Sequence, residues 1–84
     1  MSGGPVIEVR VKLTFPETLV RTPVLAQVVK RFGVEPNIRR ANVEEDRGWI
    51  VCEIDGEAPS VEAALAWLRG SGVQVDLLGD VLEG

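Results

Sequence analysis

The segment from Ile7 to Phe15 alternates apolar and polar residues without interruption. Successive side chains of a β-strand point to opposite faces, so this period of two predicts a strand with one buried face. Pro16 should end the strand, because proline cannot donate a hydrogen bond to a β ladder. One parity carries the apolar residues Ile7, Val9, Val11, Leu13 and Phe15, and the other carries Glu8, Arg10, Lys12 and Thr14.

A first helix is expected at about residues 23–32. Thr22 and Pro23 read as an N-cap followed by proline at the first helical position, and Gly33 would supply a left-handed cap at the other end. The apolar positions recur with a spacing of three and four residues, which makes one stripe along a helix. They are Leu25, Val28, Val29 and Phe32.

A second helix is expected to open at Pro59, with Ser60 or Ala58 as its cap, and to end at residues 70–72, which read Gly-Ser-Gly. Its apolar positions repeat the spacing of the first helix. They are Val61, Ala64, Leu65 and Leu68. Trp67 also lies in this segment, where partial burial against the sheet or against a dimer partner is its expected role.

Three further strands are predicted, of which the one at residues 37–45 has the weakest pattern. Ile38, Ala41 and Val43 do not share one parity, so a bulge or an edge position is expected there. The acidic run at residues 44–46, followed by Arg47 and Gly48, is typical of a hairpin turn. Residues 49–55 and 73–77 alternate more regularly and complete the set.

The predicted order is β-α-β-β-α-β. Two right-handed crossovers through helices place both helices on one face of a four-stranded antiparallel sheet, which is the ferredoxin-like arrangement of the α+β class. We expect one domain at residues 6–78, with flexible termini at 1–5 and 79–84. The second face of the sheet should carry no helix, and Glu8, Arg10, Lys12, Trp49 and Val51 should lie on it.

Composition excludes several classes of protein. A chain of 84 residues with 45% hydrophobic and 26% charged residues has the size and balance of one small globular domain. The sequence has no apolar run long enough to span a membrane and no signal-peptide pattern, so we expect a cytoplasmic protein without membrane insertion. Its net charge of −4 opposes nucleic-acid binding.

The side-chain inventory argues against catalysis, metal binding and a cofactor. Histidine is absent, and Cys52 is the single cysteine. Cys52 lies in an apolar alternating run, where a buried thiol acting as a small hydrophobic residue is expected. Without a histidine to activate it, a nucleophilic role is disfavoured. We therefore predict no catalytic residue, no metal ligand and no cofactor.

Trp49 and Val51 are the candidates for an interaction face. Residues 47–54 partly resemble a motif of RNA-recognition modules, which share the ferredoxin-like topology and stack bases on aromatic residues. Trp49 occupies one stacking position, but Val51 occupies the other, and the first strand offers no central aromatic residue. A protein-interaction surface on the uncovered sheet face is therefore favoured over an RNA-binding one.

The chain resembles the NIL domain over residues 6–78. The segments VEPNIRRANV (34–43), GWIV (48–51), IDG (54–56), VEAALAWL (61–68) and GVQVDLL (72–78) carry the resemblance. Its most specific parts are Asn37-Ile38 and the stretch from Ala63 to Leu78. Residues 13–16, which read LTFP, and Thr22-Pro23 agree as well. The best-known members of this family form the C-terminal regulatory part of the ATPase subunit of bacterial methionine importers.

The resemblance implies an ACT-like fold, a homodimer and a ligand. Members in the importers bind methionine between paired domains, and Asn37 and Ile38 match the positions of that ligand site. The residue type of Asn37 also suits a turn or strand start, where its amide bonds the backbone. An amino-acid-sensing domain without catalytic activity is therefore the leading hypothesis.

Phe15-Pro16 is more similar to a stand-alone branch of the family, which is associated with ferredoxin-type cluster modules and with sulfur amino-acid assembly. The resemblance to this branch implies an alternative: an accessory subunit that works with a ferredoxin-type partner in sulfur metabolism or transport. Because the chain has no cluster cysteines, that module would be a separate protein.

Overall fold

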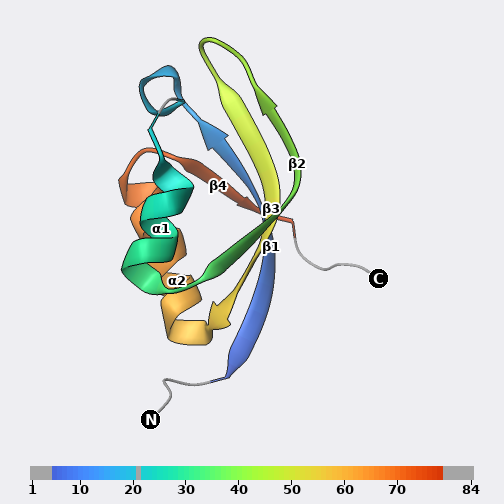
Figure 1. Cartoon of the computed structure of the whole chain (residues 1–84), viewed down its shortest axis with the longest axis vertical. Coiled ribbons are helices and arrows are strands. Elements are labelled where there is room, and N and C mark those ends of the chain that lie inside the picture. The colour runs from blue at the N-terminus through green and yellow to red at the C-terminus, as the bar shows by residue number, and fades with distance from the viewer. Residues whose placement is uncertain (1–4, 21, 79–84) are drawn as a thin grey trace.

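The computed structural model describes residues 5–20 and 22–78. Its elements follow in the order β1 (Val6–Phe15), the 3-10 turn η1 (Glu17–Leu19), α1 (Val24–Phe32), β2 (Glu35–Val43), β3 (Gly48–Glu57), α2 (Ala58–Gly70) and β4 (Gln74–Leu77). The four strands form one antiparallel sheet in the order β2-β3-β1-β4, and both helices cover the same face of it (Figure 1). The predicted ferredoxin-like fold is confirmed.

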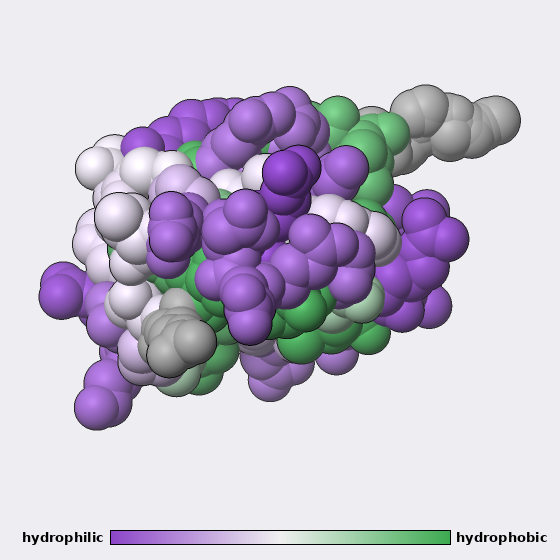
Figure 2. Space-filling model, turned by 90° about the horizontal axis from the view of Figure 1, so that it is seen from above, coloured by the Kyte–Doolittle hydropathy of each residue, from purple (hydrophilic) through white to green (hydrophobic). Residues whose placement is uncertain are grey.

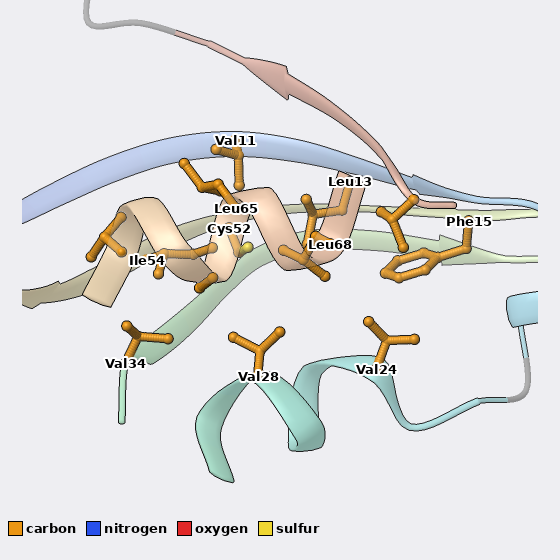
Figure 3. Packing of buried hydrophobic residues seen from close by; sticks show 13 residues of the cluster. Val11, Leu13, Phe15, Val24, Val28, Val34, Cys52, Ile54, Leu65 and Leu68 are labelled. Carbon is orange, nitrogen blue, oxygen red and sulfur yellow. The ribbon is translucent and has the colours of Figure 1, made fainter. Parts of the chain in front are cut away.

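β1 occupies the sheet interior because one of its faces is apolar throughout. Val11, Leu13 and Phe15 point toward the helices and are buried, as the alternation of the segment predicts. β3 pairs with β1 over its whole length and buries Cys52 and Ile54 on the same side. The helices close this core with Val24, Val28, Leu65 and Leu68 (Figure 3).

The helix boundaries differ from the prediction at their N-termini. α1 begins at Val24, with Pro23 rather than Thr22 at the N-cap and no side-chain cap. The Thr22 carbonyl instead accepts the Val24 N–H at 2.7 Å in a tight turn. α2 begins at Ala58 with Glu57 at the N-cap, so neither Ser60 nor Ala58 is its cap. The first N–H of the helix, that of Ala58, donates to the Pro5 carbonyl at 2.8 Å.

The strand boundaries were correct for β1 to within one residue and were wrong for β2 and β3. β2 runs from Glu35 to Val43 instead of residues 37–45, since an edge strand tolerates a proline such as Pro36. β3 continues through Gly56 to Glu57, beyond the predicted end at residue 55. Gly33 adopts φ 70° after α1, so the predicted left-handed cap is confirmed.

Of the predicted termini, residues 1–4 and 79–84 lie outside the described residues, and Pro5 is held by its bond to Ala58. α1 and α2 have 9 and 13 residues, and in the described part of the chain no helix has the length and hydropathy to cross a bilayer. Trp67 is half-buried, as expected: it packs against the core, with its ring 6.2 Å from that of Phe32.

Candidate ligand site on the open sheet face

We call the sheet surface opposite the helices the open face. The register of the strands shows which side chains lie on the open face, because residues paired across neighbouring strands share a face. Glu8 pairs with Asp55, Arg10 with Glu53 and Thr14 with Trp49. The five residues predicted for this face, Glu8, Arg10, Lys12, Trp49 and Val51, all lie on it.

A bulge in β2 adds charge to the open face. The register between β2 and β3 shifts between Ile38 and Arg40, so Arg39 is an extra residue. As a result, two consecutive arginines reach the same face: Arg39 contacts Glu53, and Arg40 lies over Trp49. The predicted bulge and edge position of this strand are confirmed.

Glu53 lies at the centre of the open face between two arginines. Arg10 approaches its Oε2 at 2.6 Å from β1, and Arg39 approaches its Oε1 at 3.0 Å from β2. The Glu53 side chain is only 9% exposed, whereas the two arginines are more than half exposed. Hydrogen bonds from Arg10 and Arg39 lower the pKa of Glu53 below its ordinary value. This cluster of Arg10, Glu53 and Arg39 could not be predicted from the sequence, because it depends on the register of three strands and on the bulge.

Trp49 forms a second cluster toward the β2–β3 hairpin. The Lys12 ammonium lies 5.3 Å from the ring centroid, and the Arg40 guanidinium lies 6.0 Å from it. Both distances suit cation–π attraction. Val51 pairs directly with both Lys12 and Arg40, so it lies between these cations. The predicted interaction residues Trp49 and Val51 thus share a half-buried, cation-flanked part of the open face.

Asn37 pairs with Glu53 of β3 and also reaches the carboxyl group of Asp55, on the side of Glu53 away from Trp49. Its Nδ2 donates to Asp55 Oδ2 at 3.4 Å, and Glu8 is paired with Asp55 on the next strand. The charges of Glu53 and Asp55 raise the pKa of Glu8. Oδ1 of Asp55 is buried without a hydrogen-bond partner among the described residues. Sequence reasoning singled out Asn37 but not Glu8 and Asp55, which only strand pairing brings together.

Ile38 faces away from Asn37. It pairs with Cys52 and lies on the helix side of the sheet, where the residue is 56% exposed. The two predicted ligand residues are therefore adjacent in the chain but point to opposite faces of an edge strand. Within one protomer they do not converge on one point.

Neither of two hollows on the described surface is lined by Asn37 or Ile38. One of about 180 Å³ is mostly apolar and lies between η1, α1 and the β2–β3 hairpin, with Phe15, Leu25 and Ile50 in its walls. Hydrophobic surface is exposed between hydrophilic patches at this end of the molecule (Figure 2). The other, of about 430 Å³, lies between α1, α2 and the strand ends, and includes Asp55 and Glu35.

Cys52 is fully buried, and burial raises the pKa of its thiol to about 11. The prediction of a buried thiol is confirmed, and this group is poorly suited to act as a nucleophile. Among residues 5–20 and 22–78, no three acidic or cysteine side chains gather in a way that could hold a metal ion. The side chains of the open face offer hydrogen bonds and charge.

The fold and the open face define a small ferredoxin-like domain with an uncovered, charged sheet surface. A family model described as the NIL domain matches residues 9–76, and the chain belongs to this family. It is 33% identical to the methionine import ATP-binding protein MetN of Rhodospirillum rubrum, over 96% of this chain and 23% of that protein. The corresponding protein of Vibrio cholerae is 32% identical over 86% of this chain and 22% of its own length.

The chain thus spans about a quarter of the length of these relatives. A crystal structure of the C-terminal domain of an ABC transporter ATP-binding protein from Enterococcus faecalis superimposes with a TM-score of 0.74 at 24% identity. The match covers 86% of this chain and 84% of that domain. The similarity at this identity shows that the two share a fold.

Proposed function

We propose that this chain is a regulatory domain without catalytic activity that binds methionine or a related sulfur amino acid at a dimer interface. The observation that carries the proposal is the position of Asn37, exposed on an edge strand beside two carboxyl groups, in a domain related to those of methionine importers. The domain would occupy residues 6–78 and work in the cytoplasm, where it would act on a transport or sulfur-metabolism protein.

The chemistry of an amino-acid ligand fits this end of the sheet. A zwitterion needs donors for its carboxylate, acceptors for its ammonium group and an apolar slot for its side chain. Asn37 offers both a donor and an acceptor on one amide, and no strand among the described residues pairs with the outer edge of β2. Ile38 supplies exposed apolar surface on the other side of the strand.

The separation of Asn37 from Ile38 supports a site shared by two protomers. A ligand held by Asn37 could reach the apolar surface of a second copy, whose Ile38 would be exposed in the same way. A homodimer through β2 would also cover Val43, which is 66% exposed on this edge. Unpaired strand edges favour such association.

Thermal unfolding with added methionine tests the proposal. Ligand at 100 times its dissociation constant stabilises by about 2.7 kcal/mol, which raises the midpoint by about 10–20 °C in a domain this small. Asn37→Ala should abolish the shift. Asn42→Ala is the matched control, because Asn42 is exposed on the same face of the same strand. The proposal fails if methionine, homocysteine and S-adenosylmethionine all leave the midpoint unchanged.

A second candidate function is that of an accessory subunit that docks a protein partner, such as a ferredoxin-type protein. The half-buried Trp49, with Lys12 and Arg40 on its ring, favours this alternative. Affinity capture from native cytoplasm should then recover one reproducible partner. Trp49→Ala should lose that partner, while Glu45→Gln on the exposed hairpin should retain it.

A further inference from the structure

Side chains of the open face form two rows that cross the sheet, one basic and one acidic. Strand pairing defines each row, because residues paired on neighbouring strands lie side by side. The basic row comprises Lys12 of β1, Val51 of β3 and Arg40 of β2. The acidic row comprises Glu8, Asp55 and Glu35 of the same three strands. The open face therefore carries opposite charge on its two halves.

Glu53 lies midway between the two rows. Along β3, Val51 and Asp55 flank it at equal distances, two positions away on either side. Glu53 forms ion pairs with Arg10 and Arg39, so the row between the basic and the acidic one carries only a small excess of positive charge. The two charged rows are thus placed symmetrically about the centre of the face.

We propose that two copies of this chain associate through their open faces, about a two-fold axis that lies between the sheets and crosses the strands at Glu53. Such an axis reverses the strand direction of the second copy. The basic row of each copy then faces the acidic row of the other. A two-fold contact uses the same surface on both partners, so it requires a surface that is complementary to itself, as these two rows are.

The next residues outward on the open face match as well. Beyond the basic row lies Trp49, which is half-buried, and beyond the acidic row lies Val6, which is 76% exposed. Alternate residues of a strand share a face, so Val6 lies on the same side as Glu8. The proposed axis brings the Trp49 end of each copy over the Val6 end of the other, which would remove apolar surface from water at both ends.

The mixed charge of the face favours a second copy over other occupants. A nucleic acid or an acidic protein would meet the acidic row, and a basic protein would meet the basic row. The contact should be weaker than one through the β2 edge, because most of its side chains are charged and hydrated. Asp76, which pairs with Lys12 from β4, also lowers the positive charge of the basic row. We therefore expect association at high protein concentration and low salt.

Sedimentation equilibrium of the full chain without ligand tests the proposal. At about 1 mM protein and about 0.02 M salt, the wild type should reach twice the mass that it has at micromolar concentration, and about 0.5 M salt should reverse this doubling. The doubling is measured from the species present at micromolar concentration, so it is separate from any association through β2. It is also independent of methionine binding, because no ligand is present.

Exchange of charges locates the contact on the open face. Glu8→Lys with Glu35→Lys makes both ends of the face basic, and Lys12→Glu with Arg40→Glu makes both ends acidic. Each variant alone should keep its micromolar mass at high concentration, because rows of like charge would meet. An equimolar mixture of the two variants should double its mass again, because each basic face would meet an acidic one.

Glu17→Lys with Glu62→Lys is the matched control. It changes the net charge as much as the first variant does, at exposed positions on η1 and α2, and it should double in mass as the wild type does. A wild type that does not double, a doubling that both exchange variants retain, or a mixture that keeps the mass of its components would overturn the proposal. Circular dichroism should show that both exchange variants are folded.

Discussion

Glu53 and Glu8 are two carboxylates of one sheet face in opposite electrostatic settings. Arg10 and Arg39 hold the pKa of Glu53 below its ordinary value, whereas the charges of Glu53 and Asp55 raise the pKa of Glu8. A carboxylate with a depressed folded-state pKa contributes stability above its unfolded pKa, and this contribution is lost as pH falls through the folded value. A raised pKa has the reverse effect, so Glu8 opposes folding at neutral pH.

Two matched substitutions test this contrast. Glu53→Gln should lower the free energy of unfolding at neutral pH, and the loss should shrink as the pH is lowered. Glu8→Gln should raise the free energy of unfolding at neutral pH. This gain in stability should disappear in acid, where Glu8 of the folded wild type is protonated. Urea unfolding at a series of pH values from neutral to about pH 3 measures both. Effects of the same sign in the two variants would contradict this account.

Among the elements, β1 was the most predictable and β2 the least. Strict alternation fixed which residues of β1 are buried, because a strand between two others must present one face to the core. In β2 the weak pattern indicated an edge and a bulge, but Pro36 suggested a later start. The partner of each β2 residue depends on cross-strand pairing, so the Arg39–Glu53 and Asn37–Asp55 contacts could not be found from sequence.

The extension of β3 beyond Asp55 has a steric cause at Gly56. A Cβ at this position would lie 3.0 Å from Cγ1 of Val34 and 3.3 Å from Cγ2 of Val61. The missing side chain lets α2 and the start of β2 pack closely against the end of β3. In the sequence, the pair Asp55-Gly56 is typical of a turn. In the structure, the strand continues through Gly56, where Val34 and Val61 pack closely.

Gly56→Ala should destabilise the fold by about 1–3 kcal/mol, because the added methyl group meets two buried valines. Gly70→Ala is the control, since its Cβ would meet nothing within 4 Å, and helix propensity limits its effect to about 1 kcal/mol in the stabilising direction. Chemical denaturation measures both. Equal stability of Gly56→Ala and the wild type would show that Val34 and Val61 leave room for a methyl group at this position.

For the whole molecule, the fold was predictable and the candidate site was only partly so. The order of helices and strands followed from periodicity, and the handedness of crossovers then left one arrangement. Asn37 was found through its family resemblance, whereas Glu8 and Asp55 needed the register of the sheet. A domain this small buries a limited core, and its β2 edge exposes Ile38 and Val43, which gives a physical reason for a homodimer.

Sedimentation velocity at micromolar concentration should show a dimer for the wild type. Ile38→Glu places a charge on the exposed β2 edge and should give a monomer. Leu77→Glu is the control, because Leu77 is similarly exposed on β4, at the other edge of the sheet. A wild-type monomer at all concentrations, or a dimer lost only in Leu77→Glu, would contradict association through β2.

Most of the functional predictions depend on one proposal, that a sulfur amino acid binds beside Asn37 on the open face. A titration of ¹⁵N-labelled protein with L-methionine, followed by ¹H–¹⁵N correlation spectra, tests it most directly. We expect saturable shifts in the side-chain amide of Asn37 and in the backbone amides of Glu8 and Asp55, with the Trp49 indole unchanged. Spectra that do not change at millimolar methionine, or shifts confined to Trp49 and its neighbours, would contradict it.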